Sequence, residues 1–168
     1  MNAIRWEKIA LFAGLSFSEL ELVSPMFEQV RIKAGQAVLT EGEDGEDMYI
    51  LVQGKVRIVK SMLLKNLDLM GHEPRKVLAT LTGDAYPVFG EMALIDDAPR
   101  SATVETLEPS VFLRVHRDRF FELAKSHPDL GCKLLAAVGK RLAAMVRTSN
   151  GEVVKLTTAL ALLLQGKR

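Results

Sequence analysis

Residues 89–104 of the chain are Phe89-Gly90-Glu91-Met92-Ala93-Leu94-Ile95-Asp96-Asp97-Ala98-Pro99-Arg100-Ser101-Ala102-Thr103-Val104. They place the carboxylate of Glu91 nine positions before the guanidinium of Arg100. Gly90 lets the backbone approach a ligand closely, and the residues after it can form a short helix whose free N–H groups point at an anion. The Arg100 fork suits phosphate oxygens, and the Glu91 carboxylate suits a sugar hydroxyl. The segment therefore predicts a binding site for a sugar phosphate.

Around this segment, residues 29–115 alternate short apolar runs with Gly-containing turns, which is typical of an all-β sandwich or barrel. Met48, Ile50 and Val52 would share one face of a strand, whereas Val59 starts to leave the alternation of the next strand. Strands are expected at 47–53, 55–58, 77–81, 102–106 and 111–115. These strands predict a β-roll, which would be flanked by helices.

Helical patterns occupy both ends of the chain. Residues 3–26 are expected to be helical, and Ser16 and Glu19 have the spacing of a capping box. After the β region, Asp118 is a good N-cap for a helix over 119–125. The N-terminal and C-terminal helices would then flank the roll.

A second C-terminal helix is expected to begin at Pro128, a residue type favoured in the first helical turn. The Asn150-Gly151 pair predicts a stop or a kink in this helix. Apolar residues recur at helical spacing on both sides of that pair, at Leu135, Val138, Leu142 and Met145 before it and at Val153, Leu156, Leu160 and Leu163 after it.

The predicted fold class is mainly β with flanking helices (α+β), a jelly-roll-like double-stranded β-roll with N-terminal helices and a long C-terminal helix. The predicted organisation is a helical segment over 1–28, a β-roll over 29–117 with the site segment at 89–104, lid or dimerisation helices over 118–149, and a helical tail over 150–168.

The 89–104 segment resembles the phosphate-binding cassette of cyclic nucleotide-binding domains, and the resemblance extends over about residues 9–147. It implies that Glu91 binds the ribose 2′-hydroxyl and that Arg100 pairs with the cyclic phosphate. The implied ligand-binding set is Phe89, Gly90, Glu91, Met92, Ala93, Arg100, Ser101 and Ala102. Main-chain amides around Gly90, Met92 and Ala93 would complete the phosphate site, with a hydroxyl contact from Ser101.

The resemblance further implies that the long C-terminal helix closes over the purine, where Arg141 or Arg147 would contact the base. Cyclic AMP is the expected ligand, because a hydroxyl at the position of Ser101 occurs in cyclic AMP binders; cyclic GMP is the alternative. One departure stands out, because Ala85-Tyr86-Pro87-Val88 follows the Gly83-Asp84 turn where family members usually have a single residue. These extra residues are expected to form a bulge or loop at the rim of the site.

Composition argues for one ordinary domain. The chain has 168 residues, a formal net charge of +1 and a hydrophobic fraction of 48%, so it offers no basic surface for nucleic acid. Its single cysteine, Cys132, is consistent with a reducing cytoplasm and is expected to be an inert, packed thiol. The longest apolar run, over 159–164, is far shorter than the roughly twenty residues of a membrane span. A cytoplasmic protein without a membrane segment is expected.

Catalytic and metal-binding readings find no support in the sequence. A metal-binding cupin, whose β-roll is similar, needs closely paired histidines, and this chain has only His72, His116 and His127, all isolated. Each is expected to be a surface or capping residue. No Ser/His/Asp or Cys/His constellation is recognisable. The expectation is a binding protein that is not an enzyme and holds no metal and no cofactor.

A homodimer through the C-terminal helices is the expected assembly. The positions that alternate in steps of four and three would suit a coiled coil if the helix ran through Gly151; they are Leu142, Val146, Ser149, Val153, Leu156, Leu160 and Leu163. The apolar flap at 61–75 is expected to contact the C-terminal helix or a second copy. Direct DNA binding is not expected, since only about twenty residues follow Ser149 where related transcription factors need several dozen for a DNA-binding motif. Two readings stay open. The chain is either a cyclic nucleotide sensor that signals to an effector protein, or a degenerate fold that acts as a ligand-independent interaction module.

Overall fold

The structure is a computed structural model, and it describes residues 4–62 and 75–165. Its centre is a β-roll made of two four-stranded antiparallel sheets. The strand order of the first sheet is β1 (Glu28–Ile32), β8 (Ser110–His116), β3 (Asp47–Gln53) and β6 (Val88–Phe89). The order of the second is β2 (Ala37–Leu39), β7 (Thr103–Thr106), β4 (Lys55–Ser61) and β5 (Arg75–Thr82). The predicted fold class is confirmed.

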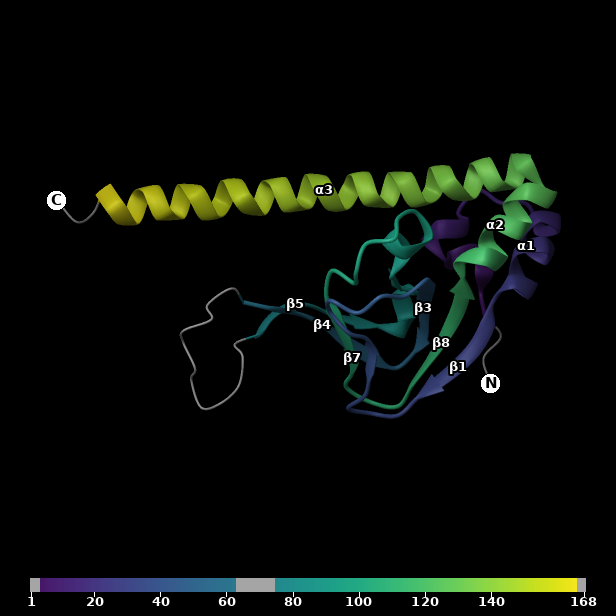
Figure 1. Cartoon of the computed structure of the whole chain (residues 1–168), viewed down its shortest axis with the longest axis horizontal. Helices are drawn as coiled ribbons and strands as arrows, with labels where there is room; N and C mark the ends of the chain where they lie inside the picture. The colour runs from purple at the N-terminus through teal and green to yellow at the C-terminus, as the bar shows by residue number, and fades with distance from the viewer. Residues whose placement is uncertain (1–3, 63–74, 166–168) are drawn as a thin grey trace.

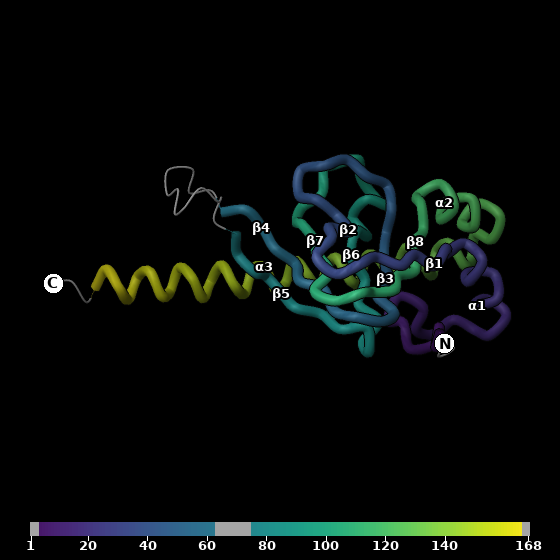
Figure 2. Tube along the Cα trace, turned by 90° about the horizontal axis from the view of Figure 1, so that it is seen from below, coloured from purple at the N-terminus to yellow at the C-terminus, as the bar shows by residue number. Residues whose placement is uncertain are grey.

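Helices flank the roll at both ends of the sequence. The N-terminal ones are the 3-10 helices η1 (Trp6–Lys8) and η2 (Ala10–Phe12), the helix α1 (Phe17–Val23) and the 3-10 helix η3 (Ser24–Met26). The C-terminal ones are α2 (Arg117–Ser126) and α3 (Pro128–Gln165). Figure 1 shows α3 lying along one side of the roll and continuing well past it. In Figure 2, α1 and α2 gather at one end of the roll, and the β4–β5 hairpin projects from the other.

The first sheet forms a middle layer with a core on each face. Met48 and Ile50 on β3 are buried in a cluster that includes residues of the N-terminal helices, α2 and α3. Tyr49 and Leu51, which alternate with them, are buried in a second cluster between the two sheets together with Phe112. The period-2 alternation of one strand therefore supplies both cores, and the helices cover the outer face of the first sheet.

The cap of α1 agrees with its prediction, and the cap of α2 does not. The Ser16 hydroxyl accepts a bond from the Glu19 amide at 3.2 Å, and the Glu19 carboxylate accepts one from the Ser16 amide at 2.8 Å, so the capping box is confirmed. In contrast, α2 begins at Arg117, and His116 is its N-cap, with Nδ1 accepting from the Asp118 amide at 3.2 Å. The predicted Asp118 cap is wrong, because β8 runs into α2 with no intervening loop.

Helix α3 is continuous through Asn150 and Gly151, so the predicted stop at this pair is wrong. A single glycine in a helix interior costs only about 1 kcal/mol relative to alanine, which a long helix tolerates. Val138 is the last buried residue on α3, and beyond it apolar side chains are exposed at Met145, Val146, Val153, Val154, Leu156, Leu160, Leu162, Leu163 and Leu164. The C-terminal half of α3 thus carries an apolar surface that none of the other residues described by the structure covers.

Cys132 also differs from its prediction, because its side chain is exposed and not packed. It lies two residues from the buried Leu130 and Leu134, which is about 200° around the helix at 100° per residue. Apolar neighbours in the sequence do not bury a side chain on the opposite face.

Part of the flap lies outside the described residues, namely Leu63, Leu64, Leu67, Leu69 and Met70, and so does His72. The expected contact of the flap with α3 or a second copy stays a prediction. Within 4–62 and 75–165, no helix combines the length and hydropathy that crossing a membrane requires.

Candidate functional site

The cassette begins with a glycine that the local geometry requires. Gly90 has φ +78°, in the left-handed region, and leads into the 3-10 helix η5 (Glu91–Leu94). A Cβ added at Gly90 would lie 2.9 Å from the Asp47 carbonyl oxygen, so a larger residue would be both strained and obstructed. The Ala93 amide donates to the Gly90 carbonyl at 3.1 Å and closes the turn. The Ala93 amide is therefore already engaged within η5.

Arg100 lies near the end of the cassette in the sequence, and its side chain lies beside Gly90 at the start of this turn. Its amide donates to the Glu43 carbonyl and its carbonyl accepts from the Gly42 amide, both at 2.9 Å. These bonds hold the Arg100 backbone against the loop between β2 and β3. The guanidinium lies between two glycines, since a Cβ at Gly45 would be 2.7 Å from Nη2 and one at Gly90 would be 3.1 Å from Nη1.

Arg100 is half-buried, and its guanidinium carries a buried donor that no described residue uses. Its Nη1 is inaccessible to solvent and has no hydrogen-bond partner among the residues that the structure describes. Burial lowers the pKa of Arg100, while the nearby Tyr49 and Asp47 act in the opposite direction, and the group stays protonated at neutral pH. A buried charged donor left unpaired costs free energy. An anion placed beside Nη1 would remove that cost.

Glu91, the other predicted ligand-binding side chain, is already paired. It is only 3% exposed, and its Oε1 accepts a hydrogen bond from Arg141 Nε at 2.5 Å. A second nitrogen of the same guanidinium donates to the Val88 carbonyl. Arg141 lies on α3, so the long helix is bonded directly to the carboxylate that is predicted to hold the ribose. The contacts of Arg141 are with Oε1 of Glu91 and with the Val88 carbonyl, and not with the second carboxylate oxygen of Glu91.

The extra residues before the cassette have a structural role in this contact. They begin with Ala85, the last residue of the 3-10 helix η4 (Gly83–Ala85), and end with Val88, the first residue of β6, which pairs with Ile50 of β3. Tyr86 lies between η4 and β6 with φ +47° and is buried. These residues therefore form a turn and a short strand, and the Val88 carbonyl is a second acceptor for Arg141.

The other residues predicted to bind the ligand differ in how exposed their side chains are. Phe89 is buried in the core between the sheets, and Met92 is 38% exposed. Ser101 is exposed, and its carbonyl accepts from Lys60 Nζ at 2.5 Å, while Ala102 is half-buried. Arg147 is exposed on α3, about one and a half turns beyond Arg141. Gly90, Glu91, Arg100 and Arg141 are thus brought together, and the base contact expected of Arg141 or Arg147 stays a prediction.

Sequence reasoning missed two residues that shape the site, Gly45 and Arg117. Gly45 contacts the Arg100 guanidinium, and Arg117 donates to the Ala93 carbonyl at 2.6 Å. Both contacts cross long stretches of sequence, and neither residue lies in a motif that would have identified it. No group of His, Cys, Asp and Glu within 4–62 and 75–165 has the arrangement of a metal site.

Known proteins resemble this chain over the same region. The cyclic AMP receptor protein of Thermus thermophilus is 28% identical over 132 residues, which are 79% of this chain and 56% of that protein. A cGMP-dependent protein kinase of Eimeria tenella is 32% identical over 120 residues, or 71% of this chain and 10% of the kinase. The crystal structure of the Thermus thermophilus catabolite activator protein superposes with a TM-score of 0.75 and 26% identity, covering 88% of this chain and 63% of that one.

This chain therefore spans little more than half the length of its bacterial relative. The profile of the cyclic nucleotide-binding domain matches residues 29–127, which include both sheets, the cassette and α2. Because this match covers more than half of the chain, the chain belongs to the family of cyclic nucleotide-binding domains.

Proposed function

We propose that this chain is a regulatory module that binds cyclic AMP at the cassette and transmits binding through α3. The observation that carries the proposal is the buried Arg100 Nη1, which has no hydrogen-bond partner among the described residues and lies beside Gly90. A cyclic phosphate is a diester with one negative charge, so one guanidinium neutralises it. Charge-assisted bonds to phosphate are among the strongest that a side chain makes.

In this proposal each group has a separate role. Arg100 and main-chain amides of the cassette hold the phosphate, and the free oxygen of Glu91 accepts a bond from the ribose 2′-hydroxyl. Arg141 keeps the Glu91 carboxylate neutralised and connects it to α3. The ligand then shifts α3 only to the extent that it binds one helix position more tightly than another. The role is binding and regulation, without catalysis.

Cyclic AMP is proposed over cyclic GMP on two grounds. A hydroxyl follows Arg100 at Ser101, and the bacterial relative is named for cyclic AMP. The kinase relative is named for cyclic GMP, so both nucleotides belong in the test. A cytoplasmic location and an effector protein stay predictions.

Isothermal titration calorimetry with cyclic AMP, cyclic GMP and 5′-AMP tests the function. We expect cyclic AMP to bind most tightly and Arg100→Gln to weaken it at least about a hundredfold, because a buried phosphate without its counter-charge costs several kcal/mol. Arg119→Gln is the matched control, since this arginine is exposed on α2. Unchanged binding by Arg100→Gln would remove the proposed mechanism.

The alternative is a ligand-independent interaction module, which the exposed apolar side chains of α3 favour. Thermal unfolding separates the two functions. A ligand at about a hundred times its Kd adds roughly 2.7 kcal/mol to the free energy of unfolding. No shift with millimolar cyclic AMP, cyclic GMP or a cyclic dinucleotide would favour the interaction module.

We further propose that the chain forms a homodimer through α3. Reading the exposed stripe as heptads places Val146, Val153 and Leu160 at one core position and Leu142, Ser149, Leu156 and Leu163 at the other. Two of the three residues at the first position are β-branched and three of the four at the second are leucine, and this combination favours a parallel two-stranded coiled coil. The continuity of α3 through Gly151 keeps the heptad in register.

Sedimentation equilibrium at micromolar concentration tests the assembly. We expect twice the mass of the chain for the wild type and a monomer for Leu156→Asp. Lys155→Asp is the matched control, because it places the same charge one residue away and off the heptad core. A wild-type monomer would reject the dimer.

A further inference from the structure

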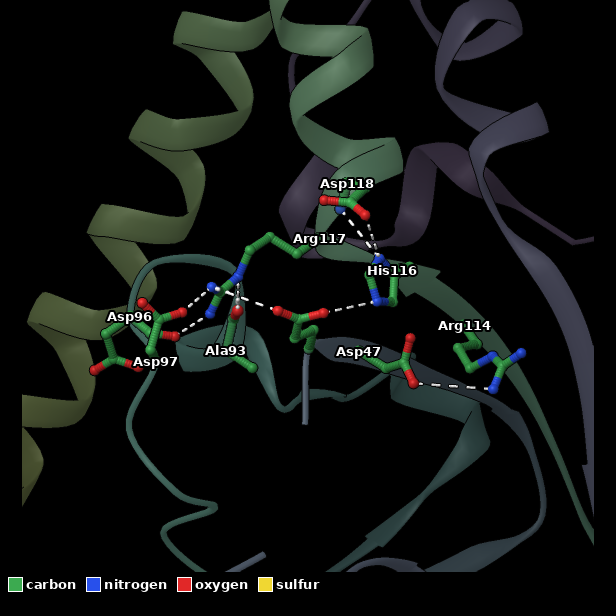
Figure 3. Close-up of polar contacts among 9 residues, drawn as sticks. Asp47, Ala93, Asp96, Asp97, Arg114, His116, Arg117 and Asp118 are labelled. Atoms are coloured by element: carbon green, nitrogen blue, oxygen red, sulfur yellow. Dashed lines mark hydrogen bonds and ion pairs between the residues drawn. The ribbon is translucent and has the colours of Figure 1, made fainter. Parts of the chain in front are cut away.

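A second arginine, Arg117, is the first residue of α2 and contacts the cassette (Figure 3). Its Nε donates to the Ala93 carbonyl at 2.6 Å, and its two terminal nitrogens reach the Asp97 carboxylate and the Asp96 carbonyl. All three acceptors belong to the cassette. The Arg117 side chain is only 18% exposed, so one planar fork holds the far end of η5 and the loop that follows it.

The same guanidinium also contacts the loop that positions Arg100. Glu46 lies 4.0 Å from Arg117 Nη1 and 3.0 Å from His116 Nε2, and its carbonyl accepts from the Arg117 amide at 2.9 Å. Three residues earlier, the Glu43 carbonyl accepts from the Arg100 amide at 2.9 Å. Gly45, between them, contacts the Arg100 guanidinium. One short loop therefore touches both arginines.

We propose that Arg117 is a positioning residue that couples occupancy of the cassette to α2 and, through it, to α3; the inference rests on the proposed nucleotide binding. A phosphate beside Gly90 and Arg100 acts on one end of η5, and Arg117 holds the carbonyl groups near the other end. Because η5 has only four residues, a displacement of the cassette moves the acceptors of Arg117 with it. Arg117 lies in the first turn of α2, so that displacement reaches the helix directly.

The planar geometry of the Arg117 guanidinium distinguishes this coupling from a simple electrostatic attraction between α2 and the cassette. Guanidinium presents its donors in a fixed plane, so it constrains the relative positions of Ala93, Asp96 and Asp97. An ammonium is a point charge on a flexible stem and does not reproduce that constraint. Lysine at position 117 would retain attraction to Asp97 and lose the simultaneous bonds to the two carbonyls.

Hydrogen exchange on the full chain, with and without saturating cyclic AMP, tests the coupling. In the wild type we expect the ligand to slow exchange in the cassette, in α2 and in α3. In Arg117→Gln we expect slower exchange in the cassette alone, with Kd raised about tenfold, inside the range of five to 150-fold that is usual for coupled sites. Arg117→Lys should behave like Arg117→Gln, and Arg119→Gln like the wild type.

The possible results distinguish a failure of the Arg117 coupling from a failure of the proposed nucleotide binding. Wild-type binding with normal ligand protection of α2 in Arg117→Gln overturns the coupling and leaves nucleotide binding intact. Equal loss of protection in the cassette and α2 also overturns it, because it reveals a purely structural attachment. A wild type that binds no cyclic nucleotide overturns the proposed function and the coupling together. Should Arg117→Gln fail to fold, Arg117→Lys carries the test, because it retains the attraction to the Asp97 carboxylate and loses the simultaneous bonds to the Ala93 and Asp96 carbonyls, and the same reduction in α2 protection is expected.

Discussion

A substitution at Gly45 would displace the Arg100 guanidinium, which is proposed to bind the phosphate, without replacing Arg100 itself. A Cβ at this position would lie 2.7 Å from Nη2, 2.9 Å from Nε and 3.1 Å from Cζ of Arg100, where ordinary contacts are 3.4–4 Å. In Gly45→Ala the guanidinium must therefore retreat by roughly 0.7 Å. A hydrogen bond lengthened by this amount from about 2.8 Å no longer qualifies as one. Losing one charge-assisted bond costs about 1.5–3 kcal/mol, so Kd for cyclic AMP should rise about 10- to 150-fold.

The free energy of unfolding of Gly45→Ala, in contrast to its affinity for cyclic AMP, should not fall. The displaced atoms are the far end of a flexible side chain, and Gly45 does not have the left-handed backbone that opposes alanine. Replacing glycine by alanine at a compatible position stabilises by about 0.4–1 kcal/mol through the unfolded state. Urea denaturation without ligand should therefore give an unchanged or slightly raised free energy of unfolding, while calorimetry reports the loss of affinity.

Gly35→Ala is the matched control, with the opposite expected effects on stability and affinity. Gly35 lies between β1 and β2, with φ +75° and open space around its Cβ position, so alanine should cost about 1–2 kcal/mol of stability and leave Kd within about twofold. Wild-type affinity in Gly45→Ala would refute the argument that the Arg100 guanidinium must occupy its observed position. A stability loss in Gly45→Ala as large as that of Gly35→Ala would refute the argument that its contact is with a movable group.

Three further changes test other parts of the structure. Glu91→Ala should reduce the preference for cyclic AMP over its 2′-deoxy analogue from about tenfold to less than about twofold, measured by calorimetry with both ligands; a surviving preference would assign the hydroxyl to another group. The hydrogen bond from Lys133 at 2.6 Å holds the pKa of Glu19 below its ordinary value of 4.5, so the wild type loses stability as pH falls below that value. Glu19→Gln should flatten this part of the acid-unfolding curve. Superimposable curves for the variant and the wild type would contradict this expectation. Phe112→Ala, at a fully buried position between the sheets, should cost about 3–5 kcal/mol in urea denaturation, and a loss below 1 kcal/mol would contradict the assigned core.

The roll was predictable because its strands carry short-range signals. The strand 47–53 has the predicted bounds, and its alternation is what divides the side chains between two cores. Val59 was expected to leave the alternation of the next strand, and the register shifts between Ile58 and Val59. Such patterns depend on residues one or two positions apart, which the sequence displays directly.

The wrong predictions concern properties that depend on distant or global context. Glycine and asparagine weaken a helix locally, yet α3 passes through Asn150 and Gly151 because the cost is small for one long element. Cys132 has apolar neighbours in sequence and solvent around it in space. For the site, Glu91 and Arg100 were identifiable because their chemistry lies within ten residues. Arg117 contributes only through the place where α2 begins.

In the proposed mechanism, the contact between Arg141 and Glu91 lets α3 act as a lever, because the helix extends far beyond this contact. Arg141 is bonded to two groups beside the cassette, whereas the helix beyond Leu142 leaves its apolar side chains exposed and continues past the roll (Figure 1). At 1.5 Å per residue, the distance from Arg141 to Gln165 is about 36 Å. A tilt of about 10° at this anchor would move the helix end by about 6 Å over that length. A displacement at the carboxylate proposed to bind the ribose would thus become large enough at the end of α3 to rearrange the proposed helix pair.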